Sequence, residues 1–407
     1  GGHSISAGFE QAVELGSPLL RFSLGFRLGR CFRVRFGPIG FLLVRLGLGI
    51  GVDFRIGIGL GDAISRFFGS GGAGRGVVIV QPDTGYRPHG ATKNAYMAHS
   101  SWDFLSNDDD PLDDTVKGKI QFPGHGTRTG SVIISPPEFK LGPSSAVWVT
   151  GVAPAATWIP ARVTNRVILI DRAEYDIDNV ASAIRHASGG NRSLIKRQAD
   201  IISMSLGGTP KRELKEALEF AENNGVIVLA AAGNVVKTVV WPANYDSVIS
   251  VAATNYSETL WADSAYIGRV KIAAPGEDVW TAVSERTVNG FVDCVEPGSG
   301  TSFAVATMAG VAALWISRHA ESKEFKELRY SAKVPAAFRT LLNARRSNSD
   351  SPFVARRPTG WNNAWGPGII DAEKLLCLTL PTTQELSSGQ YKGSCSATCS
   401  DVPGCGS

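Results

Sequence analysis

The sequence predicts an α/β domain with a doubly wound, mostly parallel sheet and helices on both of its faces. Three observations predict this fold. Between Arg75 and Leu376, short apolar runs alternate with segments of helical pattern. The apolar runs are continuous rather than alternating, which is typical of strands covered on both faces. The helical segments between them provide the right-handed crossovers that parallel strands require.

The expected strands are short and rich in β-branched residues, and the expected helices carry apolar residues three and four positions apart. The last of these helices is almost wholly apolar, so we expect it inside the core. The strands are Val77–Val80, Asp200–Ser205, Val226–Ala231 and Ser247–Val251. The helices are Asp178–Ala187, Arg212–Asn223 and Ser302–Ser317.

The composition excludes several classes of protein. Of the 407 residues, 43% are hydrophobic and 19% are charged, so the chain can bury a large core and is neither disordered nor collagen-like. No run of about 18 uncharged apolar residues occurs, and we expect no transmembrane segment. The net charge of +4 is too small to indicate a nucleic-acid partner.

The amino-terminal extension, residues 1–68, differs from the rest of the chain. From Phe22 to Leu60, apolar residues occupy nearly every even position, a period of two that fits strands and no helix. A folding-assisting prosegment or a surface-adhering strand array would explain the pattern. However, the many glycines at odd positions specify strand register weakly, which favours a low-complexity extension. Its basic bias lacks Lys and aromatic–basic modules, so it does not indicate nucleic-acid binding either.

Residues 69–76 are expected to form a Gly-rich linker. The run superficially suggests a phosphate-binding glycine loop. Such a loop must follow a strand and open a helix, whereas this run precedes a strand.

Residues 377–407 are expected to form a Cys-rich tail. A metal site would need paired thiols with a histidine or a fourth cysteine nearby, and this tail has no histidine. Disulfides that include Cys377 fit better and favour a secreted or extracytoplasmic location, although their connectivity stays open. The six cysteines are Cys31, Cys294, Cys377, Cys395, Cys399 and Cys405.

Four polar residues lie where expected strands end or helices begin. Asp83 and Asn234 follow apolar strands. His125 lies between two glycines at a helix start, and Ser302 opens the apolar helix. Each has an ordinary role as a turn former, a cap or a structural histidine. Because strand ends share one edge of a parallel sheet, we expect the four to meet there, as the parts of nucleophilic acyl transfer.

The segments around these residues resemble the motifs of the subtilisin-like serine peptidases (subtilases), and the resemblance extends from Val77 to Leu376. All appear in the family's order. One departure is Ala306, which stands where the family's serine helix usually has Pro. The amino-terminal extension also differs from the family's usual propeptide, which leaves autoprocessing open. The matching segments are Asp83–Gly85, His125–Thr127, Ala231–Asn234 and Gly300–Ser302.

The resemblance implies a catalytic domain at residues 77–376 with serine endopeptidase activity and no cofactor needed for catalysis. Ser302 would be the nucleophile, His125 the general base and Asp83 the residue that orients the imidazole. The Asn234 side chain and the Ser302 backbone N–H would bind the oxyanion.

The resemblance also implies a protein or peptide substrate that pairs as an extended strand with residues 205–207. The pocket for its first residue would be bounded by small and apolar residues, so we expect an apolar or aromatic substrate side chain there. The expected substrate-binding residues are Ser205, Leu206, Gly207, Gly208, Ala231, Ala232 and Gly233.

Some alternatives stay open. A non-hydrolytic relative would act as a peptide-binding scaffold or a peptide-processing transferase. The acidic residues 108–110 with Asp113 and Asp114 favour a solvated loop over the structural Ca²⁺ site that many relatives have. We expect no catalytic metal, no nucleic-acid partner and a monomer.

Overall fold

The structure is a computed structural model, and it describes residues 64, 66–68, 72–93, 96–97, 100–114, 122–137, 139–141, 149–169, 176–189, 193–343, 366–391, 393–396 and 399. Almost all of the extension at residues 1–68, together with Cys31 and Cys405, lies outside the described residues. The described part of the expected linker, residues 72–76, packs on the domain: Ala73 is buried, and its carbonyl accepts a hydrogen bond from the Ala155 N–H.

A seven-stranded parallel sheet forms the core and confirms the predicted fold class. The chain adds two strands on one side of β1 and four on the other, so its direction of growth switches at β1. Carboxyl ends of strands next to such a switch are where α/β sheets place their ligands. In spatial order the strands are β2 (Trp102–Asp103), β3 (Thr157–Arg162), β1 (Val78–Asp83), β5 (Ile201–Met204), β7 (Ile227–Ala231), β8 (Ile249–Thr254) and β9 (Ile272–Pro275).

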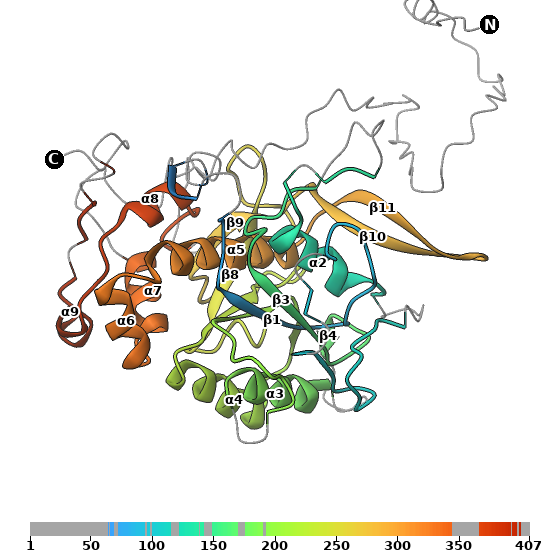
Figure 1. Cartoon of the computed structure of the whole chain (residues 1–407), viewed down its shortest axis with the longest axis horizontal. Helices are drawn as coiled ribbons and strands as arrows, with labels where there is room; N and C mark the ends of the chain where they lie inside the picture. The colour runs from blue at the N-terminus through green and yellow to red at the C-terminus, as the bar shows by residue number, and fades with distance from the viewer. Residues whose placement is uncertain are drawn as a thin grey trace, which may run out of the picture. The chain divides into compact units, whose positions relative to one another are not determined.

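Helices cover both faces of this sheet (Figure 1). Helices α3 (Asp176–Ala187) and α4 (Arg212–Asn223) lie on one face, and α2 (His125–Ile134) and α5 (Thr301–His319) lie on the other. Helix α4 has the predicted range and buries Leu214, Ala217, Leu218 and Ala221, as its period of 3.6 requires.

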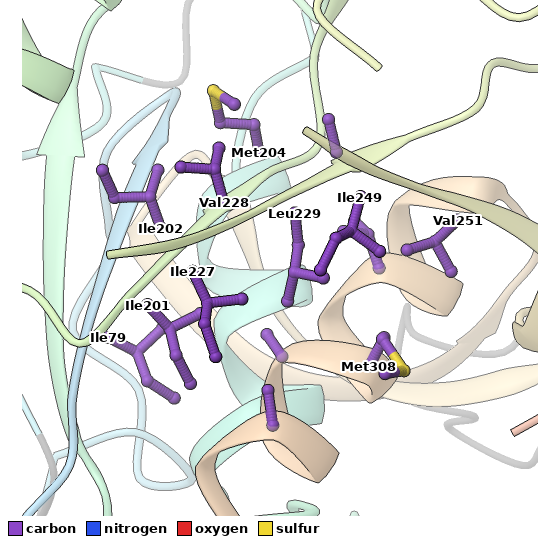
Figure 2. Close-up of a cluster of buried hydrophobic side chains, with 14 of the residues drawn as sticks. Ile79, Ile201, Ile202, Met204, Ile227, Val228, Leu229, Ile249, Val251 and Met308 are labelled. Carbon is purple, nitrogen blue, oxygen red and sulfur yellow. The ribbon is translucent and has the colours of Figure 1, made fainter. Parts of the chain in front are cut away.

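Helix α5 is buried from Thr301 to Ile316, which confirms its predicted place in the core. Figure 2 shows Met308 of this helix in one core cluster with side chains of β1, β5, β7 and β8. Among the described residues, α5 is the one helix with the length and apolarity to cross a bilayer, and these properties reflect its burial in the core.

Shorter elements surround the core. Strands β10 (Val279–Thr287) and β11 (Gly290–Gly298) form an antiparallel hairpin that leads into α5, and β4 (Ile168–Leu169) pairs with β6 (Gly207–Gly208). The remaining helices are α6 (Lys323–Tyr330), α7 (Val334–Asn343), α8 (Ala372–Cys377) and α9 (Thr383–Ser388).

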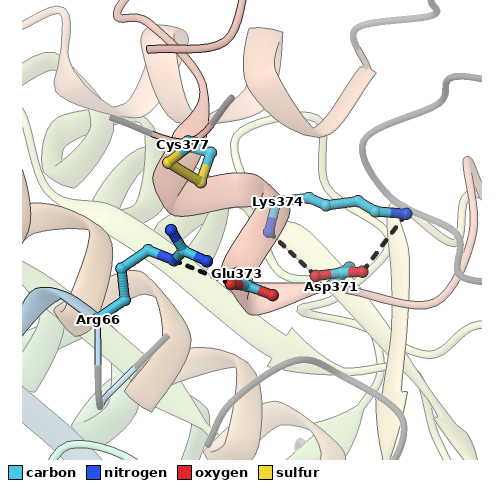
Figure 3. Close-up of a disulfide and its surroundings, with 6 residues drawn as sticks. Arg66, Asp371, Glu373, Lys374 and Cys377 are labelled. Carbon is cyan, nitrogen blue, oxygen red and sulfur yellow. Dashed lines mark hydrogen bonds and ion pairs between the residues drawn. A yellow bond between two sulfur atoms is a disulfide. The ribbon is translucent and has the colours of Figure 1, made fainter. Parts of the chain in front are cut away.

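A disulfide joins Cys377 at the end of α8 to Cys399 in the tail, as predicted for Cys377. Cys294 and Cys395 are disulfide-bonded as well. Figure 3 shows the Cys377 bridge beside α8, where Arg66 forms an ion pair with Glu373. The bridge therefore joins the end of α8 to a residue 22 positions further along the chain.

Candidate active site

Asp83 is the last residue of β1, the strand at the switch point of the sheet. Its side chain is fully buried, and its Oδ1 accepts hydrogen bonds from the Thr84 N–H at 2.7 Å and from His125 Nδ1 at 2.8 Å. An ionised carboxylate accepts both bonds without reorganisation. The β1 backbone stays in register with β3 up to this residue, because Asp83 aligns with Arg162.

His125 is the first residue of α2, as predicted from its flanking glycines. Gly124 precedes it with φ of +76°, a conformation that residues with a side chain rarely adopt, so a glycine suits the entry into this helix. The imidazole is 11% exposed and donates through Nδ1 to Asp83, which leaves the Nε2 lone pair free to accept a proton.

Ser302 lies in the first turn of α5, with His125 Nε2 at 3.2 Å from its Oγ. The structure therefore brings together an acid, an imidazole and a hydroxyl from β1, α2 and α5. The Ser302 carbonyl accepts a hydrogen bond of 3.1 Å from the Ser205 Oγ, which fixes the backbone of this turn.

Asn234 follows β7 and lies beside the same turn. Its Oδ1 accepts hydrogen bonds from the Thr301 N–H at 2.9 Å and the Thr301 hydroxyl at 2.8 Å, so the amide is oriented with Nδ2 on the opposite side. Within the described part of the chain, neither Nδ2 nor the Ser302 N–H has a hydrogen-bond partner.

The nitrogen atoms of these two donors border the same space beside Gly300. A Cβ built on Gly300 would lie 3.3 Å from Asn234 Nδ2 and 3.7 Å from the Ser302 nitrogen. The space that glycine leaves open is therefore bordered by two unpaired N–H donors at the positive end of a long helix, which suits a developing negative charge.

The predicted substrate-binding segments lie on two neighbouring strand ends. Residues 205–208 follow β5, and residues 231–233 close β7, its parallel neighbour. One edge of the first segment already has a partner: β4 pairs with β6, and the Gly207 N–H donates to the Val167 carbonyl at 2.9 Å. A substrate strand that pairs with Gly207 would therefore exchange this bond for its own.

Val240 lies between these two segments and was not predicted from the sequence. Its N–H donates to the Ala232 carbonyl, while the carbonyl of the next residue accepts from the Gly208 N–H. A Cβ built on Gly207 would lie 2.8 Å from Val240 Cγ2, and one on Gly233 would lie 3.2 Å from both methyl groups. The Val240 isopropyl group thus packs against both segments and narrows the space between them.

The polar residues that hold His125 in place were not predicted from the sequence either. The buried Asp113 carboxylate accepts from the Thr84 hydroxyl at 2.8 Å and from the Gly124 N–H at 2.7 Å. The Thr84 hydroxyl in turn accepts from the Gly126 N–H at 3.1 Å. Asp113 was visible only as part of an acidic run, and the sequence offered no signal for its partners.

The acidic residues around Asp113 do not form a cation site in the structure. Asp103 and Asp114 both form ion pairs with the buried Arg162, and Asp113 faces N–H and O–H donors. Over the described ranges, no group of three or more His, Cys, Asp or Glu side chains is placed to hold a metal ion. The carboxylates of Asp103, Asp113 and Asp114 are therefore already paired with a guanidinium group or with hydrogen-bond donors.

An acid, an imidazole and a hydroxyl hydrogen-bonded in series at the edge of a parallel sheet are the arrangement of a serine hydrolase. The subtilase family profile matches residues 74–368. The chain therefore belongs to the subtilase family, as the sequence motifs indicated.

Individual relatives agree with this assignment. Thermitase of Thermoactinomyces vulgaris is 30% identical over 248 residues, which cover 60% of this chain and 76% of thermitase. The major intracellular serine protease of Bacillus subtilis (strain 168) is 27% identical over 269 residues, covering 64% of this chain and 75% of that protein. An extracellular protease of Xanthomonas campestris pv. campestris is 28% identical over 257 residues, covering 61% of this chain and 39% of that protein.

A solved structure supports the fold. A protease from Pseudoalteromonas arctica superposes with a TM-score of 0.60 at 25% identity, covering 78% of this chain and 93% of that one. The family and these relatives support serine protease activity for this chain. Because the relatives are named as intracellular in one case and extracellular in another, they do not define its compartment.

Proposed function

We propose that this chain is a serine endopeptidase in which Ser302, His125 and Asp83 form the catalytic triad. The observation that supports it most is the continuous row of hydrogen bonds from Asp83 Oδ1 through both imidazole nitrogens to Ser302 Oγ. Asp83 holds the tautomer with the proton on Nδ1, so Nε2 faces the hydroxyl as a base.

The reaction follows from these positions. Ser302 Oγ attacks the carbonyl carbon of the scissile peptide bond while His125 Nε2 takes its proton. The oxyanion enters the space above Gly300 and accepts hydrogen bonds from Asn234 Nδ2 and the Ser302 N–H. The imidazolium then protonates the leaving amine, and a water molecule repeats the sequence to release the acid product.

Covalent labelling tests the nucleophile. A fluorophosphonate probe should label the wild-type chain at Ser302, and Ser302→Ala should abolish labelling. Ser299→Ala is the matched control, because this exposed serine lies three residues away and only accepts a hydrogen bond from the Asp278 N–H. Absence of labelling in the folded wild type would favour a peptide-binding scaffold.

Product analysis tests the reaction. Incubation with casein should give peptides whose masses show addition of water, and phenylmethylsulfonyl fluoride should stop it. Products that lack the added water would instead identify a peptide-processing transferase.

We further propose that the substrate side chain preceding the scissile bond is apolar and, because of Val240, small rather than aromatic. The Val240 methyl groups lie against both Gly207 and Gly233, so they fill space between the two segments and leave less room for a phenyl ring. Small apolar pockets discriminate by roughly 10–200-fold for each methylene group.

Peptide p-nitroanilides that differ only in this residue test the preference. Wild type should cleave Ala better than Phe, and Val240→Gly should raise the Phe-to-Ala ratio of kcat/KM by about 10-fold or more. Val236→Gly, an exposed valine in the same loop, is the control and should leave the ratio unchanged. A profile dominated by Arg or Lys would refute the apolar pocket altogether.

We also propose that the protein matures in an oxidising compartment. This rests on the Cys377–Cys399 disulfide and the disulfide-bonded state of Cys294 and Cys395. Thiol titration of the unfolded protein should detect these four cysteines only after reduction. Free thiols at Cys377 and Cys399 in protein purified from its native source would contradict the proposal.

A further inference from the structure

Gln81 is a buried amide that follows three apolar residues in the middle of strand β1. It lies in β1, two residues before Asp83, and is 1% exposed. Because side chains alternate along a strand, Gln81 and Asp83 point to the same face of the sheet, toward α2. A buried amide without partners would cost about 1–3 kcal/mol, so its partners indicate what it does.

The Gln81 amide forms hydrogen bonds with α2, the helix that begins with His125, and with Trp158, which packs against α2. Nε2 donates to the Gly126 carbonyl at 3.0 Å and to the Thr129 hydroxyl at 2.9 Å. Oε1 accepts from the indole N–H of Trp158 on β3 at 3.1 Å. The amide orientation follows from these partners, since a flipped amide would place Oε1 against a carbonyl and NH₂ against an N–H.

The contacts continue to the backbone of His125. The Thr129 hydroxyl, which accepts from Gln81, donates to the His125 carbonyl at 3.0 Å. Trp158, which fixes the other end of the amide, also packs on the same helix: a Cβ built on Gly130 would lie 2.5 Å from its ring. Gln81 therefore connects the strand of Asp83 to the first turn of α2 by directional bonds.

We propose that Gln81 is a positioning residue for His125, which holds the first turn of α2 at the distance from β1 that the Asp83–His125–Ser302 row requires. The proposal rests on the proposed function, because it takes His125 as the general base. Asp113 accepts from the Gly124 N–H before the helix and Thr84 accepts from the Gly126 N–H, whereas Gln81 donates to the Gly126 carbonyl in the first turn.

Gln81→Met tests this role, since methionine keeps the length of the side chain and removes its hydrogen bonds. We expect kcat to fall about 10- to 100-fold, the effect of a displacement of up to about 1 Å, with KM within about twofold of wild type. The control is Ile202→Val in the adjacent strand β5, which removes one buried methyl group and costs about 0.5–1.5 kcal/mol. A kcat for Gln81→Met within twofold of the control would overturn the proposal.

Gln81→Glu provides a second variant with the same shape. It keeps the acceptor for Trp158 and, when protonated, one donor for the helix. The loss of kcat in Gln81→Glu relative to wild type should therefore shrink as the pH is lowered, whereas the loss in Gln81→Met should not. In a double-mutant cycle, the losses from Thr129→Val and Gln81→Met should be less than additive, because both substitutions remove the hydrogen bond between these two side chains. Full additivity would contradict a shared network.

A spectroscopic readout separates this proposal from the proposed function. The proton between His125 Nδ1 and Asp83 should give a low-field NMR resonance in wild type, which shifts or broadens in Gln81→Met and stays unchanged in Ile202→Val. If the wild type neither hydrolyses peptides nor labels at Ser302, the proposed function fails while this resonance still decides the role of Gln81. An unchanged resonance in Gln81→Met would overturn that role.

Discussion

Helices α2 and α5 each present one residue of the candidate site from their first turn. The two helices differ in the length of the buried stretch that supports this turn. At the start of α2, the buried Gln81 side chain donates to the Gly126 carbonyl, and the buried side chains of Thr84 and Asp113 accept from backbone N–H groups. The start of α5 continues a helix whose residues are buried without interruption from Thr301 to Ile316. The first turn of α5 has hydrogen bonds as well, with Ser205 and Asn234, but the buried stretch of helix behind it is longer than the one behind the first turn of α2.

The difference predicts how each end responds to substitution. Loss of one hydrogen bond shifts a group with a modest loss of stability, typically about 1 kcal/mol. Loss of core volume costs about 2–5 kcal/mol but leaves the remaining packing in place. Substitutions beneath α2 should therefore change the rate most, and substitutions along α5 should change stability most.

The largest expected effect comes from removing the two residues themselves. Ser302→Ala or His125→Ala should each lower kcat by about 10⁶-fold, the size found when these members of the subtilisin triad are removed. Because the two act as one unit, the double variant should lose little more than either single variant. Casein hydrolysis by titrated enzyme measures this, and multiplicative losses would show that the two ends act separately.

The next effect concerns the donors beside α5. Asn234→Asp keeps the oxygen that accepts from Thr301 and replaces the Nδ2 donor with an oxygen, so kcat should fall about 10²–10³-fold with little change in KM. Gly300→Ala should act in the same direction, because its methyl group would enter the space between the two donors. Asn289→Asp at the exposed hairpin tip is the control, and an equal loss there would reject an oxyanion role for Asn234.

A paired measurement then compares the two helices directly. Asp113→Asn should lower kcat about tenfold by loosening the entry to α2, with a loss of stability near 1 kcal/mol. Leu314→Ala, far along α5, should cost about 2–5 kcal/mol and leave kcat within about twofold. Urea unfolding and initial rates on both variants give the two quantities. Parallel losses in both variants would remove the distinction between the two helices.

This contrast also explains which parts of the molecule the sequence could predict. Strands β1, β5, β7 and β8, together with α4 and α5, follow from the apolar pattern of the sequence, whereas β2, β3 and β9 were not predicted. Periodicity records burial, which is a property of each residue and its near neighbours. The family motifs then supplied the residues that meet at the sheet edge.

Hydrogen-bond partners distant in sequence could not be predicted in this way. Gln81 and Trp158 are 77 residues apart, and the contact of Val240 with Gly207 depends on the return of the chain beside β6. Gln81 directly follows the predicted strand Val77–Val80, and only the longer β1 of the structure shows it as a buried amide that requires partners. Their identity depends on the packed structure.

The smallest expected effect concerns the far end of α5, where two basic residues, Arg318 and His319, follow the apolar stretch. His319 in the last turn packs on Trp315, and its Nε2 is buried without a partner among the described residues. Burial, together with the charge of Arg318, lowers the pKa of His319 to about 4. In the unfolded chain the pKa returns to about 6.5, so below that pH the unfolded state binds the proton first.

The buried neutral imidazole therefore contributes fully to the free energy of unfolding above about pH 6.5. This contribution is lost as the pH falls toward 4. We expect it to account for a loss of about 2–3 kcal/mol in the free energy of unfolding over that range. The glutamine in His319→Gln cannot titrate. Between pH 7 and pH 4, the free energy of unfolding in urea should therefore fall more for wild type than for the variant. At pH 7, kcat of the variant should stay within about twofold of wild type. A difference that stays constant over the range would show that the imidazole is solvated in the folded chain and that α5 ends as an ordinary surface helix.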